Sequence, residues 1–289
     1  FDSRKNCNAI IETSTNKIIT GCSTSEIVKG VEIIGYRAFK NMLDLYELNI
    51  PSTVNSISAT AFDGCPNINK ISVSRHNLTY DSRNKCNAII ETSTNKLCIG
   101  SNNTIIPDGI EEIGACAFCG RVGLDYISIP SSVSVIREFA FEGCLYLNSV
   151  ILPAELTEIY LSAFQNCISL QGVVFQNKIE RIGESAFKNC INLQTLLLPN
   201  SINLIGFYAF EGCDNLLTLS LPDNDLCDIL DRAFSSCSSL EKVVIPYGVQ
   251  YVGNKAFANC SSLEEVYIEN NNTEIEATAF DSTVIINNM

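Results

Sequence analysis

The sequence predicts an α/β-type repeat solenoid, in which short strands from successive repeats stack into a parallel sheet. Two observations predict this fold class. Ten phenylalanines, each preceded by alanine, are spaced by 23, 56, 23, 23, 23, 23, 24, 23 and 23 residues along the 289-residue chain. Aliphatic residues follow most of them in an alternating pattern that is typical of a strand with one buried face. The ten residues are Phe39, Phe62, Phe118, Phe141, Phe164, Phe187, Phe210, Phe234, Phe257 and Phe280.

Each repeat contains the same elements in the same order. An aliphatic residue lies five positions before the phenylalanine, and three more lie six, nine and eleven positions after it, as at Leu193, Leu196 and Leu198. Pro199 then ends the strand, because proline has no N–H for the ladder. A 23-residue unit cannot bury both aliphatic rows alone, so neighbouring repeats must stack. We therefore expect a strand, a turn, a second aliphatic patch and a compact turn around Ala-Phe in every repeat.

The 56-residue interval contains one irregular repeat, residues 74–106, and part of it is a duplication. Residues 81–96 match residues 2–17 at 14 of 16 positions. The run A-I-I-E-T, the polar turn S-T-N-K and the run L-C-I-G predict a β-hairpin. Because Phe1 aligns with Tyr80, we expect the chain to begin inside such a hairpin, with repeats or a linker upstream. The expected single domain, 1–289, comprises a truncated hairpin repeat (1–28), two regular repeats (29–73), the hairpin repeat (74–106), regular repeats (107–268) and an acidic capping repeat (269–289).

The pattern I-G-x-x-A-F-x-x-C-x-x-L, seen best from Ile182 onward, resembles the BspA-type leucine-rich repeat family of bacterial surface proteins. The Y-D-S-R-x-x-C-N-A-I-I-E-T block looks like the version found in gut Bacteroidetes such as Bacteroides. The resemblance implies a right-handed leucine-rich-repeat superhelix with a concave parallel β-sheet and short helical or 3-10 turns on its convex side. It also implies a cell-surface or extracellular protein, anchored in the outer membrane or secreted.

Composition excludes several classes of function. The net charge of −13 and the pI near 4.5 argue against binding to phosphate backbones and anionic membranes. His76 is the only histidine, which removes most Ser-His-Asp and Cys-His catalytic arrangements and zinc sites that need several imidazoles. No apolar stretch approaches the ~20 residues of a membrane span. We therefore expect no nucleic-acid partner, no membrane insertion of this segment and no cofactor.

Seven of the 14 cysteines occupy one repeat position, three residues after the phenylalanine. They could form disulfides, bind a metal or pack as buried free thiols. Stacked neighbours would have Cβ atoms ~4.8 Å apart, beyond the usual disulfide separation of about 3.5–4.5 Å, so we expect buried thiols. Cys116 and Cys119 form a C-x-x-C motif, but without a second pair at zinc-ribbon spacing, which disfavours a zinc or redox site. The seven are Cys65, Cys144, Cys167, Cys190, Cys213, Cys237 and Cys260.

Carboxylates are numerous, and a pair of them could hydrolyse glycosidic bonds. Those expected on the strand face are scattered among lysines, which favours a solvated rim instead. An acidic run near the C-terminus is interpreted as a polar cap, with cation binding as an alternative. We therefore predict no catalytic, metal-binding or cofactor-binding residues. The rim residues are Glu47, Lys70, Asp125, Glu241, Lys242, Glu264 and Glu265, and the acidic run continues with Glu269, Glu274, Glu276 and Asp281.

The strand residues that face away from the core give the only candidate contact site. Ile151, Val174 and Leu197 occupy the same outward position in consecutive repeats and would form an exposed apolar stripe. Contiguous exposed apolar surface often marks a contact site, although β-branched residues also favour strands for their own sake. Both interpretations stay open here. The candidate ligand-contact residues on the concave face are Tyr126, Ile151, Val174, Leu197, Val244 and Tyr267.

Two functions are consistent with these observations. The first is a non-catalytic interaction or adhesion module, monomeric and at the cell surface, whose concave face binds a host protein, another bacterium or a glycan. The second is an accessory or scaffold module of a surface polysaccharide-utilisation enzyme whose catalytic part lies outside this segment.

Overall fold

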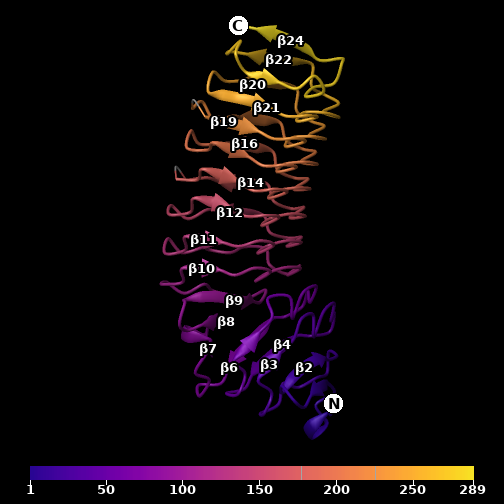
Figure 1. Ribbon diagram of the computed structural model, residues 1–289, viewed down its shortest axis with the longest axis vertical. Helices are drawn as coiled ribbons and strands as arrows, with labels where there is room; N and C mark the ends of the chain where they lie inside the picture. The colour runs from indigo at the N-terminus through magenta and orange to yellow at the C-terminus, as the bar shows by residue number, and fades with distance from the viewer. Residues whose placement is uncertain (177, 225) are drawn as a thin grey trace.

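The computed structural model describes residues 1–176, 178–224 and 226–289. Over these residues, the chain forms a β-solenoid of about 11 turns with parallel sheets and almost no helix. Its repeats stack into an elongated body with the N-terminus near one end and the C-terminus at the other (Figure 1). The expectation of a stacked repeat solenoid is therefore confirmed.

The aliphatic residue five positions before each phenylalanine lies in a strand of two to four residues. From Ile113 to Ile275, these strands pair in parallel and extend the hairpin of residues 74–106 into one long sheet. The long sheet has 11 strands, in the spatial order β23 (Glu274–Ile275), β21 (Val249–Val252), β19 (Cys227–Ile229), β17 (Leu204–Ile205), β15 (Arg181–Ile182), β13 (Glu158–Ile159), β11 (Val135–Ile136), β10 (Glu112–Ile113), β9 (Lys96–Gly100), β8 (Ala88–Glu91) and β7 (Tyr80–Asp81).

The alternating triplets form a second row of parallel strands, which is divided into short sheets. Residues 126–129 of this row are not in a strand, and β18 does not pair with β20 where the phenylalanine spacing lengthens to 24 residues. The short sheets are β4 (Glu47–Ile50) with β6 (Lys70–Val73); β12 (Ser149–Ile151), β14 (Gly172–Val174), β16 (Thr195–Leu197) and β18 (Thr218–Ser220); and β20 (Lys242–Ile245), β22 (Glu265–Ile268) and β24 (Ile285–Asn288).

Both duplicated blocks contain the antiparallel hairpin that their sequence predicts. In the first block, β1 (Ile10–Glu12) pairs with β2 (Lys17–Thr20), and β3 (Ile33–Ile34) and β5 (Ser56–Ile57) extend that sheet. In the second, β8 pairs with β9. Each block also carries a three-residue 3-10 helix, η1 (Arg4–Asn6) or η2 (Arg83–Lys85).

The compact turn expected around Ala-Phe is confirmed, but the helical or 3-10 form that the family resemblance implies for it is wrong in the described regular repeats. Each Ala-Phe segment is a series of hydrogen-bonded turns, because residues in the left-handed region interrupt any helix. In eight repeats the residue two before the phenylalanine has φ between 52° and 59°, and in nine repeats the residue two after it has φ between 59° and 73°. The second column is asparagine, glycine or serine throughout, a signal that was present in the sequence.

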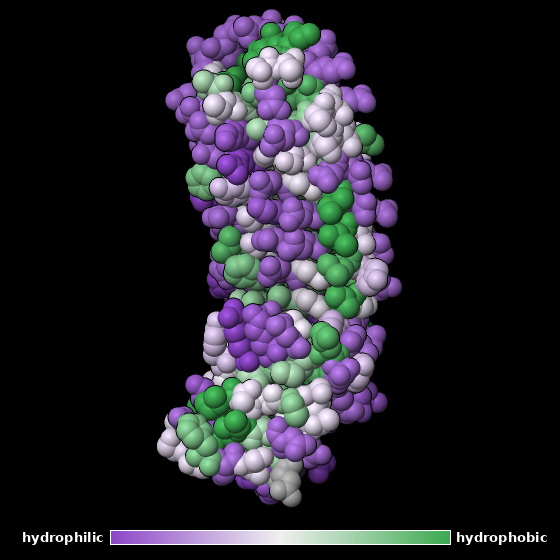
Figure 2. Space-filling view, turned by 90° about the vertical axis from the view of Figure 1, so that its right-hand side faces the viewer, coloured by the Kyte–Doolittle hydropathy of each residue, from purple (hydrophilic) through white to green (hydrophobic). Residues whose placement is uncertain are grey.

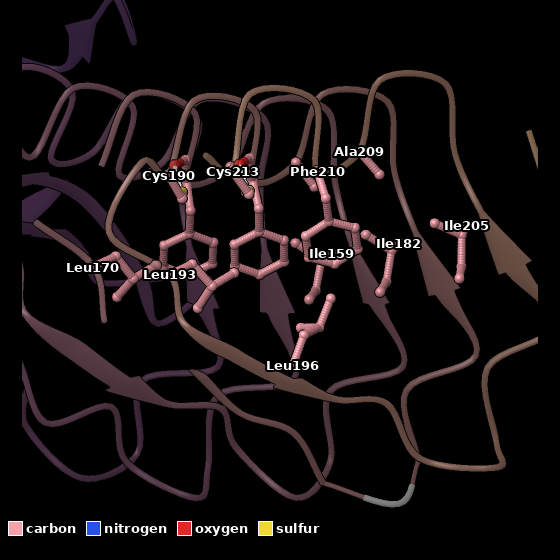
Figure 3. Close-up of a cluster of buried hydrophobic side chains, with 14 of the residues drawn as sticks. Ile159, Leu170, Ile182, Cys190, Leu193, Leu196, Ile205, Ala209, Phe210 and Cys213 are labelled. Atoms are coloured by element: carbon pink, nitrogen blue, oxygen red, sulfur yellow. Dashed lines mark hydrogen bonds between the residues drawn. The ribbon is translucent and has the colours of Figure 1, made fainter. Parts of the chain in front are cut away.

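These turns form a third ladder between repeats. Eight of the phenylalanines donate their backbone N–H to the carbonyl of the alanine before the next phenylalanine along the stack, at 2.7–2.8 Å. The rings stack directly beneath, with centroids 5.0–5.3 Å apart from Phe118 through Phe280. Figure 3 shows rings of this column beside isoleucines of the long sheet, such as Ile182, and beside Leu193, which precedes β16. The core is therefore a set of parallel columns, one residue per repeat.

The repeat cysteines form one of these columns, and all 14 cysteines of the chain are free thiols. The seven repeat cysteines are buried, as expected. Each Sγ also donates to the carbonyl of the phenylalanine one repeat earlier, at distances from 2.9 Å for Cys65 to 3.5 Å for Cys237. Burial raises the pKa of these thiols, to about 12 for Cys144 and Cys260. The column therefore adds weak hydrogen bonds between repeats as well as packing.

The core consists of two clusters that meet at the hairpin repeat. One cluster extends from Cys7 to Ile99 and the other from Cys86 to Ala279. Arg121, which takes the cysteine position in the first repeat after the hairpin, is 1% exposed at this junction. Its Nη1 donates to the carbonyls of Cys65 at 2.8 Å and Cys119 at 3.1 Å, and its Nε donates to Gly100 at 2.9 Å. One buried guanidinium thus joins the two clusters.

Candidate functional site

Ile151, Val174 and Leu197 lie on the outward face of the sheet β12–β18, at the last position of three neighbouring strands. Their side chains are 60%, 52% and 60% exposed. Residues beside them in the same strands face inward, as Val150 does in β12 and Leu196 in β16. We call Ile151, Val174 and Leu197 the apolar stripe.

A hollow of about 550 Å³ lies against the apolar stripe. Gly172 in β14 helps to form it, because the neighbouring strands carry Ser149 and Thr195 at the paired positions. We call it the Gly172 hollow, and none of its lining residues is ionisable. The lining is Ser149, Val150, Ile151, Gly172, Val173, Val174, Phe175, Thr195 and Leu197.

Sequence reasoning missed Gly172, Val173 and Phe175. Two signals were available, a glycine in the middle of a predicted strand and Gln176 in place of the proline that follows most strands. Neither signal reveals a hollow by itself, because its depth depends on how β14 and β16 pair.

The other three candidate residues lie apart from the hollow. Tyr126 is 63% exposed on the segment that forms no strand. Val244 and Tyr267 lie in β20 and β22, which belong to a different sheet, and both are only partly exposed. The Tyr267 ring lies 4.0 Å from the Lys242 Nζ, and its hydroxyl donates to Glu265 at 2.7 Å, which raises the pKa of Tyr267.

A second line of hydrophobic residues runs along the side of the stack that the Ala-Phe turns form, which we call the turn side. Figure 2 shows that this side is mostly hydrophilic, with hydrophobic residues aligned over the middle repeats. The position four residues after the phenylalanine is aliphatic in four consecutive repeats, from Val122 to Ile191. Ile168 and Ile191 are 37% and 38% exposed, less than the apolar stripe.

Comparison with known protein families identifies the repeat. Six copies of the "BspA type Leucine rich repeat region" match the chain, over residues 14–96, 88–203 and 157–287. The chain belongs to the BspA-type leucine-rich repeat family. Proteins built from BspA-type repeats are typically non-catalytic, and no catalytic domain is identified in this chain.

Three solved structures of bacterial leucine-rich repeat proteins are similar to this BspA-type chain. A leucine-rich repeat protein from Eubacterium ventriosum has a TM-score of 0.74 at 24% identity, over 82% of this chain and 64% of that one. One from Bacteroides ovatus has a TM-score of 0.65 at 27% identity, over 89% and 59%. A leucine rich cell surface protein from Faecalibacterium prausnitzii has a TM-score of 0.51 at 27% identity, over 83% and 52%. This chain therefore spans less than two thirds of each relative, and no curated protein matches it.

The C-x-x-C motif and the rim carboxylates of this BspA-type solenoid take part in local hydrogen bonds and ion pairs. Within the ranges described above, no group of three or more His, Cys, Asp or Glu side chains is placed to hold a metal ion. In the C-x-x-C motif, the hydrogen bond with Cys116, burial and the nearby carboxylates raise the pKa of Cys119, whose Sγ lies 3.3 Å from Asp63 Oδ1. Lys70 Nζ donates a hydrogen bond to the Glu47 carboxylate at 2.7 Å, which lowers the pKa of Glu47. The described residues contain no helix that could span a membrane.

Proposed function

We propose that this chain is a non-catalytic, cell-surface binding module that contacts a protein partner through the apolar stripe. The observation that carries the proposal is the exposure of Ile151, Val174 and Leu197, each 52–60% exposed, beside a hollow without ionisable groups. Contiguous exposed apolar surface next to a hollow is typical of contact sites.

Membership of the BspA-type family supports this proposal, because the leucine-rich repeat fold suggests a protein-binding surface. The relative from Faecalibacterium prausnitzii, described as a cell surface protein, supports the proposed location. The uncharged surroundings favour a protein over a glycan or a charged polymer, since apolar contact gains little from hydroxyl-rich or ionic ligands.

The test is capture of purified extracellular-matrix proteins and of arrayed glycans by the immobilised chain. Wild type is compared with Val174→Asp/Leu197→Asp, which places two charges in the apolar stripe. The matched control is Ile168→Asp/Ile191→Asp, which makes the same change on the turn side of the same repeats.

We expect the stripe variant to lose capture of a matrix protein at least tenfold and the control variant to retain it. Unchanged capture by the stripe variant would refute the stripe as the contact site. Loss in the control alone would place the contact on the turn side, and capture of glycans alone would refute a protein partner.

A further inference from the structure

The glycine at position 172 has no explanation in the fold itself. Glycine weakens the interior of a strand, and it is usually retained there for a bulge or for the close approach of another group. A Cβ placed on Gly172 would meet no heavy atom within 4 Å, and its φ lies outside the left-handed region that favours glycine. By contrast, a Cβ on Gly206 in the Ala-Phe turn region would lie 2.8 Å from the carbonyl oxygen of Ile182. The missing side chain at Gly172 therefore leaves open space at the surface.

The sheet also opens beside Gly172. Strands β12 and β14 pair at three positions, and so do β16 and β18, but β14 and β16 pair only at Gly172 and Thr195. Beyond that pair, Val173 and Phe175 are partly exposed. Val150 and Leu196, which occupy the repeat position of Val173 in the two adjacent strands, are only 2% and 0% exposed. The floor of the hollow is thus core surface that the neighbouring repeats keep covered.

The chemistry of the Gly172 hollow restricts its ligand. Its rim carries two hydroxyls, from Ser149 and Thr195, and the rest of the lining is aliphatic, aromatic or glycine. A charged group would therefore lose hydration without gaining a counter-charge, whereas a bulky apolar group would bury apolar surface on both sides.

We propose that the Gly172 hollow is an anchor pocket for one bulky apolar side chain, such as phenylalanine or leucine, presented by a protein partner. This inference rests on the proposed function, since it specifies what the partner inserts beside the apolar stripe. A single buried apolar anchor surrounded by weaker contacts is a common arrangement in protein interfaces.

The experiment fills the pocket without adding charge. Gly172→Leu suits a position where a Cβ meets no neighbour, and leucine is tolerated in a strand. The matched control is Thr218→Leu, at the same repeat position in β18 but outside the lining. Probes are N-acetyl-phenylalaninamide, N-acetyl-lysinamide and methyl β-glucoside, each followed by methyl NMR of Val173, Val174 and Leu197, with circular dichroism to verify folding.

We expect N-acetyl-phenylalaninamide to shift these methyl signals saturably in wild type and in Thr218→Leu, and at least tenfold more weakly in Gly172→Leu. Equal binding by Gly172→Leu, stronger binding of the glucoside or the lysine derivative, or no shift in wild type would each overturn the anchor pocket. The proposed function and the anchor pocket can fail independently of each other. If Val174→Asp/Leu197→Asp abolishes capture of a matrix protein while Gly172→Leu leaves it unchanged, the binding module stands and the anchor pocket does not.

Discussion

Replacing Arg121 with methionine is expected to weaken the junction between the two core clusters. Methionine fits this repeat position, because Met42 occupies it in an earlier repeat. The change removes the guanidinium that donates to Cys65, Cys119 and Gly100. Burial lowers the pKa of Arg121, so the wild type also bears a desolvation cost that the variant relieves.

The loss in the free energy of unfolding depends on the buried carbonyls that no longer have a hydrogen-bond donor. Among the described residues, the Arg121 Nη1 is the only hydrogen-bond donor recorded for the carbonyls of Cys65 and Cys119, neither of which lies in a strand. Each buried carbonyl without a partner costs about 1–3 kcal/mol. Two of them, reduced by the relieved desolvation, predict a loss of about 2–4 kcal/mol in the free energy of unfolding.

The assay is chemical denaturation followed by circular dichroism. A solenoid contacts itself only between neighbouring repeats, so a weakened junction should also separate unfolding of the N-terminal cluster from the rest and broaden or split the transition. The control is Arg181→Met, because the Arg181 side chain is 55% exposed and its guanidinium pairs with Glu158 at 3.7 Å. It should cost less than about 0.5 kcal/mol. A loss below about 1 kcal/mol for Arg121→Met, or equal losses for the two variants, would refute this reasoning.

Three further predictions concern single side chains. Phe187→Ala removes a ring whose centroid lies 5.2 and 5.3 Å from those of its two neighbours, and it should lower the free energy of unfolding by about 3–5 kcal/mol. The control Ile191→Ala, at a more exposed position, should lower it by less than about 1 kcal/mol. Similar losses for the two variants in chemical denaturation would contradict the stacked register. Hydrogen bonds with the hydroxyls of Ser25 and Thr24 lower the pKa of the exposed Cys22 thiol. Cys22 should therefore react with Ellman's reagent before the other cysteines, and Ser25→Ala should move that reaction to higher pH. Several equally fast thiols, or fewer than 14 after denaturation without reductant, would argue against the free-thiol column. Burial raises the pKa of Glu142, so the contribution of this carboxyl to stability should fall as pH rises from 4.5 through that raised pKa. Glu142→Gln should therefore raise the denaturation midpoint, relative to wild type, at pH 7 but hardly at pH 4; a lower midpoint at pH 7 would contradict this.

The sequence predicted the columns of the core well, because each column repeats a residue type at a fixed interval. Phenylalanine at 187 and 210, and the aliphatic residues around them, identify inward positions whatever the exact path of the chain. The apolar stripe was found in the same way, from one outward position read across three repeats. Tyr126, Val244 and Tyr267 share the repeat positions of strand residues. The pattern could not reveal that the second row of strands is interrupted on both sides of the apolar stripe, so that these three residues lie outside its sheet.

The repeat length, the inward and outward faces, the two hairpins and the column of thiols all follow from the residue pattern alone. Four features could be seen only in the folded chain: the Ala-Phe turns contain no 3-10 helix in the described regular repeats, the strand row splits into separate sheets, Arg121 joins two clusters and the surface opens at Gly172. The physical reason is that a residue pattern records which side chains must avoid water. Hydrogen bonds between repeats, and the places where they stop, depend on backbone geometry some 23 residues apart in the chain.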